Sequence, residues 1–207
     1  MKQLFLTSSA NVVLADIAKY LPLKPNEYNF AFINTAAEPE EGEHTWVTDD
    51  KNELIKLGFN VDEFSITNKT ISELKQKLQD KNGIFMCGGN RFYLLNQMIK
   101  TGFDKILLDK IEKGLIYIGS SAGSMILGDN LNLVATTDDK MKASDLNSNG
   151  LKYIDLVIQP HWGDESLKDE YFKFFNNMYN VNAKLILLRN NQYIYFNGDN
   201  YIINQVN

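Results

Sequence analysis

The sequence is poor in the residues that most often build cross-links and metal sites. It contains one cysteine, Cys87, and two histidines, His44 and His161. A single cysteine excludes an intrachain disulfide framework and any multi-cysteine zinc site. A chain of 207 residues buries well over half of the surface that its unfolded form exposes, so it needs neither kind of link to fold. Two histidines also leave very little choice for any mechanism that uses an imidazole base.

The sequence also lacks a strong charge and a long apolar segment. Its formal net charge of −5 at pH 7 gives no electrostatic reason to expect a nucleic acid or a membrane as partner. No stretch approaches the roughly eighteen apolar residues of a membrane span, and the apolar run near the N-terminus is too short for a signal-peptide core. We therefore expect a cytoplasmic protein.

Cofactor motifs are absent as well. Neither the glycine-rich phosphate loop nor the dinucleotide-binding fingerprint occurs. The acidic pairs in the chain lack the ligand spacing of a calcium loop. We expect no cofactor and no metal.

The apolar residues, 44% of the chain, fall into short runs separated by longer amphipathic segments. The short runs predict strands over residues 4–6, 30–33, 61–66, 83–86 and 115–118. The amphipathic segments predict helices over residues 12–20, 49–57, 72–78, 91–100 and 104–113, with Asn11 and Ser72 as capping residues of the first and third. This alternation is typical of a parallel sheet covered by helices on both faces.

The last third of the chain has a different character. We expect strands over 131–134, 156–158, 184–188, 193–196 and 201–203, and one helix over 167–178. The Asn-Gly pair within 197–200 predicts a hairpin turn, and the polar stretch 138–150 predicts a surface loop. No linker or repeat interrupts the sequence. We predict one domain over residues 1–207, an α/β fold with a doubly wound, mostly parallel sheet in three layers and a C-terminal β-hairpin.

The segment after residue 115 carries the most functional information. An apolar strand runs through Gly119-Ser-Ser-Ala-Gly into a helix, which is the context in which Gly-x-Ser-x-Gly forms a nucleophile elbow. Such a sharp turn needs almost no side chain two residues before and two residues after the serine. Ser121 meets this requirement, because Gly119 and Gly123 flank it at those positions. The alternative is that the segment is only a tight turn or an anion-binding helix start.

A nucleophilic serine needs a base and an oxyanion site. The backbone N–H of Ala122 opens the following helix, and Gly88 or Gly89, at the end of another strand, could supply a second donor. His161 follows an apolar strand, and the carboxyl ends of parallel strands are where ligands bind in such sheets. His44 lies in an acidic stretch and is expected to be a surface residue.

Three segments together resemble one family. Cys87-Gly-Gly-Asn-Arg-Phe, Gly119-Ser-Ser-Ala-Gly-Ser and Gln159-Pro-His-Trp are similar in kind, order and spacing to motifs of the dipeptidase E (aspartyl dipeptidase) and cyanophycinase family of serine peptidases. The resemblance covers nearly the whole chain. It implies a flavodoxin-like sheet, as in class I glutamine amidotransferases, and a metal-independent hydrolase of short peptides with an N-terminal aspartate. It also implies Ser121 as nucleophile and His161 as base.

Two positions depart from the family pattern. Where the family has an acidic residue to orient the histidine, this chain has Asn190, although Asp164 or Glu165 could serve instead. Where the family has a substrate-binding arginine after the histidine, this chain has none. Arg91, which follows Asn90, could bind a substrate carboxylate or be a solvated helix residue.

The sequence therefore predicts a serine peptidase of dipeptidase E type, acting on short peptides as a monomer or homodimer. Ser121, His161 and Asn190 are its expected catalytic residues. Asn90, Arg91 and Trp162 are expected to bind substrate, although Trp162 could equally be a packing residue. The alternative is a degenerate family member that binds a small peptide or carboxylate without hydrolysis. Cys87 is expected to be a buried structural residue.

Overall fold

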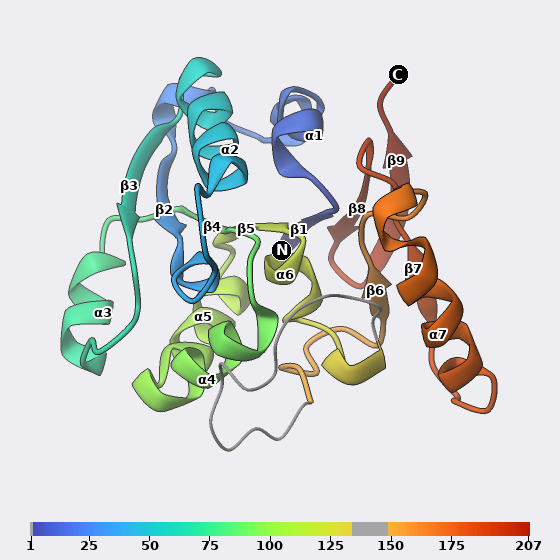
Figure 1. Cartoon of the computed structure of the whole chain (residues 1–207). Helices are drawn as coiled ribbons and strands as arrows, with labels where there is room; N and C mark the ends of the chain where they lie inside the picture. The colour runs from blue at the N-terminus through green and yellow to red at the C-terminus, as the bar shows by residue number, and fades with distance from the viewer. Residues whose placement is uncertain (1, 134–148) are drawn as a thin grey trace.

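The computed structural model describes residues 2–133 and 149–207. Its centre is a seven-stranded sheet with the order β3 (Asn60–Phe64), β2 (Asn29–Ile33), β4 (Gly83–Met86), β5 (Ile116–Ser120), β1 (Gln3–Thr7), β8 (Gln192–Asn197) and β9 (Asn200–Gln205) (Figure 1). The first five strands in this order are parallel to one another. The last two form an antiparallel hairpin at the β1 edge.

Helices cover both faces of this sheet. On one face lie α1 (Ala10–Ile17) and α2 (Thr45–Lys56), and on the other lie α3 (Ile71–Lys77), α4 (Arg91–Thr101), α5 (Phe103–Glu112) and the short α6 (Ala122–Met125) (Figure 1). Alternate residues of one strand therefore enter different cores: Phe5 packs with α1, whereas Leu4 and Leu6 pack on the opposite face. Because both faces are covered, the inner strands β1, β2, β4 and β5 are mostly apolar and buried, whereas the edge strand β3 carries Asp62 and Glu63. The predicted three-layer fold with a mostly parallel sheet is confirmed.

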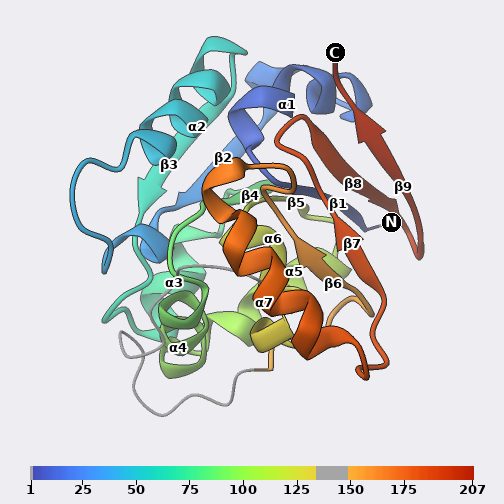
Figure 2. The ribbon, with the colours of Figure 1, turned by 45° about the vertical axis from the view of Figure 1, so that its right-hand side comes forward.

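A second, smaller sheet lies beside the first. It consists of β6 (Val157–Gln159) and β7 (Leu185–Leu187), which pair in parallel. The helix α7 (Lys168–Met178) runs across this pair (Figure 2). Tyr171 and Phe174 of α7 form a small apolar cluster with Leu185 of β7. The sequence predicted both strands but not that they would form a sheet of their own.

Helix capping differs from the sequence prediction at two positions. The N-cap of α1 is Ser9 rather than Asn11, whose backbone N–H donates instead to the carboxylate of Asp50. The N-cap of α3 is Thr70, which exchanges reciprocal hydrogen bonds with Glu73, so Ser72 lies inside the helix. Thr70 caps α3 with its side chain, whereas Ser9 makes no side-chain capping bond and the Asp50 carboxylate accepts from Asn11 N–H in α1.

The predicted strand over 131–134 is also wrong in its described part. Leu131–Leu133 form a 3-10 helix, because the Asn130 side chain accepts a hydrogen bond from Asn132 N at 2.9 Å and bends the backbone locally. Most of the predicted surface loop 138–150 lies outside the described residues. The predicted C-terminal hairpin is confirmed: Asn197 pairs with Asn200, and Gly198 adopts φ 66° in the two-residue turn.

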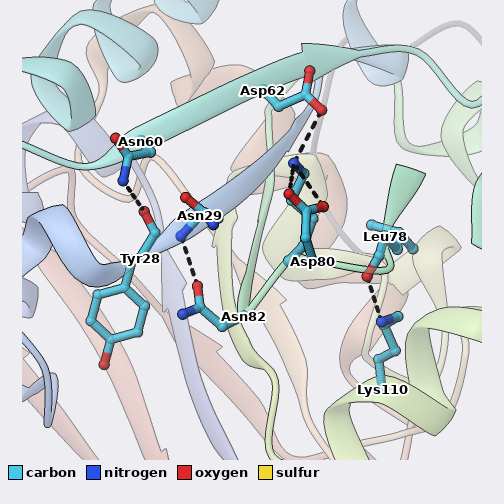
Figure 3. Close-up of polar contacts among 9 residues, drawn as sticks. Tyr28, Asn29, Asn60, Asp62, Leu78, Asp80, Asn82 and Lys110 are labelled. Atoms are coloured by element: carbon cyan, nitrogen blue, oxygen red, sulfur yellow. Dashed lines mark hydrogen bonds and ion pairs between the residues drawn. The ribbon is translucent and has the colours of Figure 1, made fainter. Parts of the chain in front are cut away.

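Asparagine side chains link the amino ends of three parallel strands (Figure 3). Asn29 N at the start of β2 donates to Asn82 Oδ1 before β4, at 2.8 Å. Asn60 Nδ2 at the start of β3 donates to the carbonyl of Tyr28 at 3.2 Å. Nearby, Lys81 forms ion pairs with Asp62 and Asp80. These contacts stabilise one end of the sheet, opposite to the end at which the motifs lie. Within the described residues, no helix is both long enough and apolar enough to cross a membrane.

Candidate active site

Ser121 lies at the junction of β5 and α6, in the strained backbone conformation that the elbow pattern predicts. Its φ and ψ angles are 48° and −108°, a combination that costs energy for a residue with a side chain. The two glycines make the turn possible. A Cβ on Gly119 would lie 2.6 Å from Gly123 O, and a Cβ on Gly123 would lie 2.1 Å from Met86 O. Only glycine fits at either position, and the serine side chain projects from a tightly packed turn.

The imidazole of His161 faces this serine. Ser121 Oγ and His161 Nε2 are 2.9 Å apart, although 40 residues separate them in the chain. His161 follows β6 and has a positive φ of 59°. Its backbone is held on both sides, because its N–H donates to Ser8 Oγ at 2.7 Å and its carbonyl accepts from the Tyr171 hydroxyl. The backbone that carries the ring is therefore held by Ser8, just after β1, and by Tyr171 of α7.

Asn190, between β7 and β8, contacts the other side of the ring. Its Oδ1 lies 2.8 Å from His161 Nδ1 and accepts a further hydrogen bond from the Ser8 hydroxyl at 2.9 Å. An amide oxygen only accepts, so this contact places the ring proton on Nδ1. In the neutral imidazole, Nε2 then carries a lone pair directed at the hydroxyl of Ser121.

The two acidic residues considered as substitutes for Asn190 are engaged elsewhere. The Asp164 carboxylate accepts hydrogen bonds from the backbone and hydroxyl of Ser166, and these bonds lower its pKa. Glu165 is exposed and pairs with Lys168 at 3.0 Å. The structure thus brings Asn190, and neither of these acids, to the ring.

The Gly88–Gly89 segment lies on the opposite side of Ser121. A Cβ built on Gly88 would be 3.3 Å from Ser121 Cβ. Gly89 has φ +136°, and a Cβ there would be 2.2 Å from the carbonyl oxygen of Ala36. In the part of the chain that the structure describes, the backbone N–H groups of Gly88, Gly89 and Ala122 donate to no acceptor. Three backbone N–H groups that no described residue accepts from therefore lie close to the serine.

A cavity of about 280 Å³ opens between these groups. The described residues that line it are Ser8, Ser9, Trp46, Gly88, Gly89, Ser120, Ser121 and His161. None of them is a cation, and none carries a carboxylate. The cavity is too small for more than a side chain and a short stretch of backbone. Among the described residues, no group of histidine, cysteine, aspartate and glutamate side chains is arranged to hold a metal ion.

The predicted substrate-binding residues do not line this cavity. Asn90 is buried and its Oδ1 caps α4 by accepting from the backbone of Phe92 and Tyr93. Arg91 is also buried, and its Nε donates to Leu131 O at 3.0 Å. Trp162 packs against aromatic rings of α7. The prediction for Arg91 assumed an exposed side chain, because an arginine in the first turn of a helix is usually exposed. Its burial depends on tertiary contacts that the sequence does not show.

Sequence reasoning did not assign Ser8, Ser9, Trp46 or Ser120 to the site, although the structure places all four in the cavity wall. Ser8 lies two residues after the predicted strand 4–6, and its place at the carboxyl end of β1 was a usable signal. Trp46 lies at the start of α2, two residues after His44, and no sequence pattern in that stretch predicts a role for it. The His44 ring itself is 5.2 Å from the Trp46 ring, and His44 Nε2 lies 3.0 Å from Glu40 O.

Two buried groups lie behind the site. Burial raises the pKa of the Asp50 carboxyl to about 6, even though Asn11 N donates to it at 2.8 Å. Burial also raises the pKa of the Cys87 thiol well above its usual value, so this thiol stays protonated and is not a nucleophile. The position of Cys87, fully buried at the end of β4, agrees with a structural role.

Comparison with known protein families decides the class of the protein. The model of peptidase family S51 matches residues 4–204. The chain belongs to peptidase family S51. It is a serine peptidase, as the sequence predicted.

Relatives of similar length support this assignment. Uncharacterized peptidase Lmo0363 of Listeria monocytogenes is 32% identical over 98% of both chains, and uncharacterized peptidase PM1590 of Pasteurella multocida is 31% identical over 98% of this chain and 97% of that protein. Peptidase E of Shewanella denitrificans is 32% identical over a shorter region, 44% of this chain and 37% of that protein. A 1.5 Å crystal structure of a candidate peptidase E from L. monocytogenes superposes with a TM-score of 0.91 over the whole of both chains, at 31% identity.

Proposed function

We propose that this peptidase hydrolyses short peptides with Ser121 as nucleophile, His161 as general base and Asn190 as the residue that orients the base. The observation that carries the proposal is the continuous hydrogen-bonded chain from Ser121 Oγ through the imidazole to Asn190 Oδ1, with contacts of 2.9 Å and 2.8 Å. Each contact is within the range in which a proton is transferred or held.

The reaction follows the two-step course of acyl transfer. Ser121 Oγ attacks the scissile carbonyl carbon while its proton moves to His161 Nε2. The carbonyl oxygen becomes negative and accepts hydrogen bonds from Ala122 N–H and from Gly88 or Gly89 N–H. His161 then protonates the leaving amine, and the C–N bond breaks to give an ester on Ser121. A water molecule, deprotonated by His161, hydrolyses this ester and returns the serine.

The neutral Asn190 gives this triad a specific weakness. An amide oxygen orients the imidazole by accepting from Nδ1–H, but it carries no charge to stabilise the imidazolium that forms during attack. In a triad built for aspartate, the change to asparagine costs about 10⁴ in turnover. Here Asn190 is held by Ser8 as well, so the orientation of the ring is preserved and the missing contribution is the charge. We expect a slow enzyme.

The cavity limits the size of the substrate. Its volume of about 280 Å³ fits one residue and the atoms around the scissile bond. We propose dipeptides and tripeptides as the substrate class. N-terminal aspartate, which the resemblance to dipeptidase E implies, rests on analogy, because none of the described residues that line the cavity is a cation.

The test is covalent labelling. Native protein and the Ser121→Ala variant are incubated with a small fluorophosphonate, and each is measured by intact mass spectrometry. One adduct on the native protein, and none on the variant, is the expected result. Cleavage of a dipeptide library that includes Asp-Xaa members then defines the substrate. Folded native protein that takes no adduct would overturn the proposal and favour a family member that binds a small peptide or carboxylate without hydrolysis.

A further inference from the structure

Trp46 makes the only described side-chain hydrogen bond to the Gly88–Gly89 peptide. Its Nε1–H donates to the carbonyl oxygen of Gly88 at 3.3 Å. The same ring forms a wall of the cavity that contains Ser121. Trp46 therefore contacts both the space for the substrate and the segment proposed to hold the oxyanion.

The Gly88–Gly89 peptide has an orientation that matters for catalysis. In a trans peptide, the carbonyl oxygen and the N–H of the next residue point in opposite directions. A contact that fixes Gly88 C=O on one side therefore fixes Gly89 N–H on the other. Where Gly89 N–H is the oxyanion donor, rotation of this peptide by half a turn would put a carbonyl oxygen in its place. An oxygen there repels the developing negative charge, whereas an N–H stabilises it.

Two consecutive glycines provide little intrinsic resistance to such a rotation. The flanking backbone is held, because Cys87 N donates to Ile33 O at 3.1 Å and Asn90 N donates to Ala36 O at 2.7 Å. Between these two anchors, Gly88 N–H and Gly89 N–H have no acceptor among the described residues. The bond from Trp46 is thus the contact that distinguishes one orientation of the peptide from the other.

Trp46 is itself well positioned to hold this contact. It lies in the first turn of α2, and its neighbours Val47 and Asp50 are buried beneath the helix. The His44 ring, 5.2 Å away, packs against the indole. With 37% of its surface exposed, Trp46 is accessible enough for substitution without opening the core.

We propose that Trp46 is a positioning residue that holds the Gly88–Gly89 peptide with Gly89 N–H available to the oxyanion. The proposal rests on the proposed serine mechanism and goes beyond it, because it selects Gly89 as the second donor and assigns the control of that donor to an indole on another helix.

The test compares Trp46→Phe, which keeps an aromatic wall but loses the N–H, with native protein. We expect kcat on a cleaved dipeptide, and the rate of fluorophosphonate labelling, to fall about tenfold, with KM changed less than about twofold. Trp46→Ala also removes the wall, so KM should rise in addition. Tyr153→Phe is the matched control, since it removes one ring hydrogen bond, to Glu112 at 2.6 Å, remote from the described cavity. Its kcat should equal that of native protein.

The outcomes separate the two proposals. Native protein without an adduct would overturn the serine mechanism and the role of Trp46 with it. Native protein that is labelled, together with a folded Trp46→Phe variant that has native labelling rate and kcat, would overturn the role of Trp46 alone. A change confined to KM would show that the ring is only a wall of the cavity and would also overturn the positioning role. Thermal unfolding of each variant shows that the comparison is between folded proteins.

Discussion

The hydroxyl of Ser8 bridges His161 and Asn190, since it accepts from His161 N at 2.7 Å and donates to Asn190 Oδ1 at 2.9 Å. One buried serine at the end of β1 thus holds the backbone of the proposed base and the side chain that orients its ring. The three residues come from positions 8, 161 and 190, so the fold rather than local sequence assembles the group.

Replacing Ser8 by alanine should lower both kcat and the free energy of unfolding. Both hydrogen bonds disappear, and the orientation of Asn190 and of the His161 ring loosens. We expect kcat to fall by about tenfold and the free energy of unfolding by about 1–2 kcal/mol, which corresponds to one or two ordinary buried hydrogen bonds. Steady-state kinetics and urea unfolding measure the two effects. Ser166→Ala, which removes an exposed serine contact with Asp164, is the control. Native kcat in Ser8→Ala would contradict this role.

Replacing Asn190 by aspartate should increase activity. Both groups that contact Asn190 Oδ1 are donors, the His161 ring N–H and the Ser8 hydroxyl, so a carboxylate oxygen fits the same contacts. The added charge stabilises the imidazolium, and we expect kcat/KM to rise by at least about tenfold at neutral pH. Asn190→Ala should lower it. The pH dependence of kcat/KM for the three proteins measures the effect, and an aspartate variant slower than native protein would show that charge is not what the triad lacks.

Replacing Asp50 by asparagine should stabilise the protein above pH 6 and have little effect near pH 4. Burial raises the pKa of Asp50 to about 6, from 3.8 in an exposed carboxyl, so the folded state binds the proton more tightly than the unfolded chain. The contribution of Asp50 to the free energy of unfolding is therefore fully present below about pH 4 and is lost as the pH rises through about 6. The free energy of unfolding of Asp50→Asn should exceed that of native protein above pH 6 by at most about 3 kcal/mol.

Thermal unfolding of native protein and Asp50→Asn at several pH values measures this difference. Asp109→Asn, a substitution of an exposed aspartate on α5 that is not among the charges acting on Asp50, is the matched control and should show no such dependence. If the two variants changed alike with pH, the burial of the Asp50 charge would not be the cause.

Replacing Gly123 by alanine should prevent the elbow from forming. The added Cβ would lie 2.1 Å from Met86 O, a backbone atom that cannot move without shifting β4. We expect a loss of more than about 3 kcal/mol in the free energy of unfolding, or no folded protein. Gly42→Ala is the comparison, because Gly42 has φ +85° but no atom within 4 Å of its Cβ, and it should cost only about 1 kcal/mol. Gly123 itself has no positive φ, so a loss of only about 1 kcal/mol in Gly123→Ala would show that a small shift relieves the contact with Met86.

The sequence predicts most of the fold because four of the five parallel strands are buried on both faces. Apolar runs mark these four strands, and Gly83–Met86 agrees with the prediction at both ends. The elbow is visible for a similar reason, since the glycine spacing is a local requirement. The sequence does not predict three other features: the proposed role of Trp46, the burial of Arg91 and the bridge made by Ser8. Each depends on contacts between residues 40 or more positions apart, so no local sequence pattern indicates it.

Ser121 directly follows a strand of the large sheet, whereas His161 lies two residues after a strand of the small one. The 2.9 Å contact between them therefore reports how the two sheets are docked, in addition to how each is folded. In mild denaturant, a relative shift of the two sheets by about an ångström would break this contact, while nearly all secondary structure would remain. Hydrolysis would then disappear at a lower urea concentration than the far-ultraviolet circular dichroism signal. Peptidase activity would therefore report the loss of packing between the two sheets before either sheet unfolds.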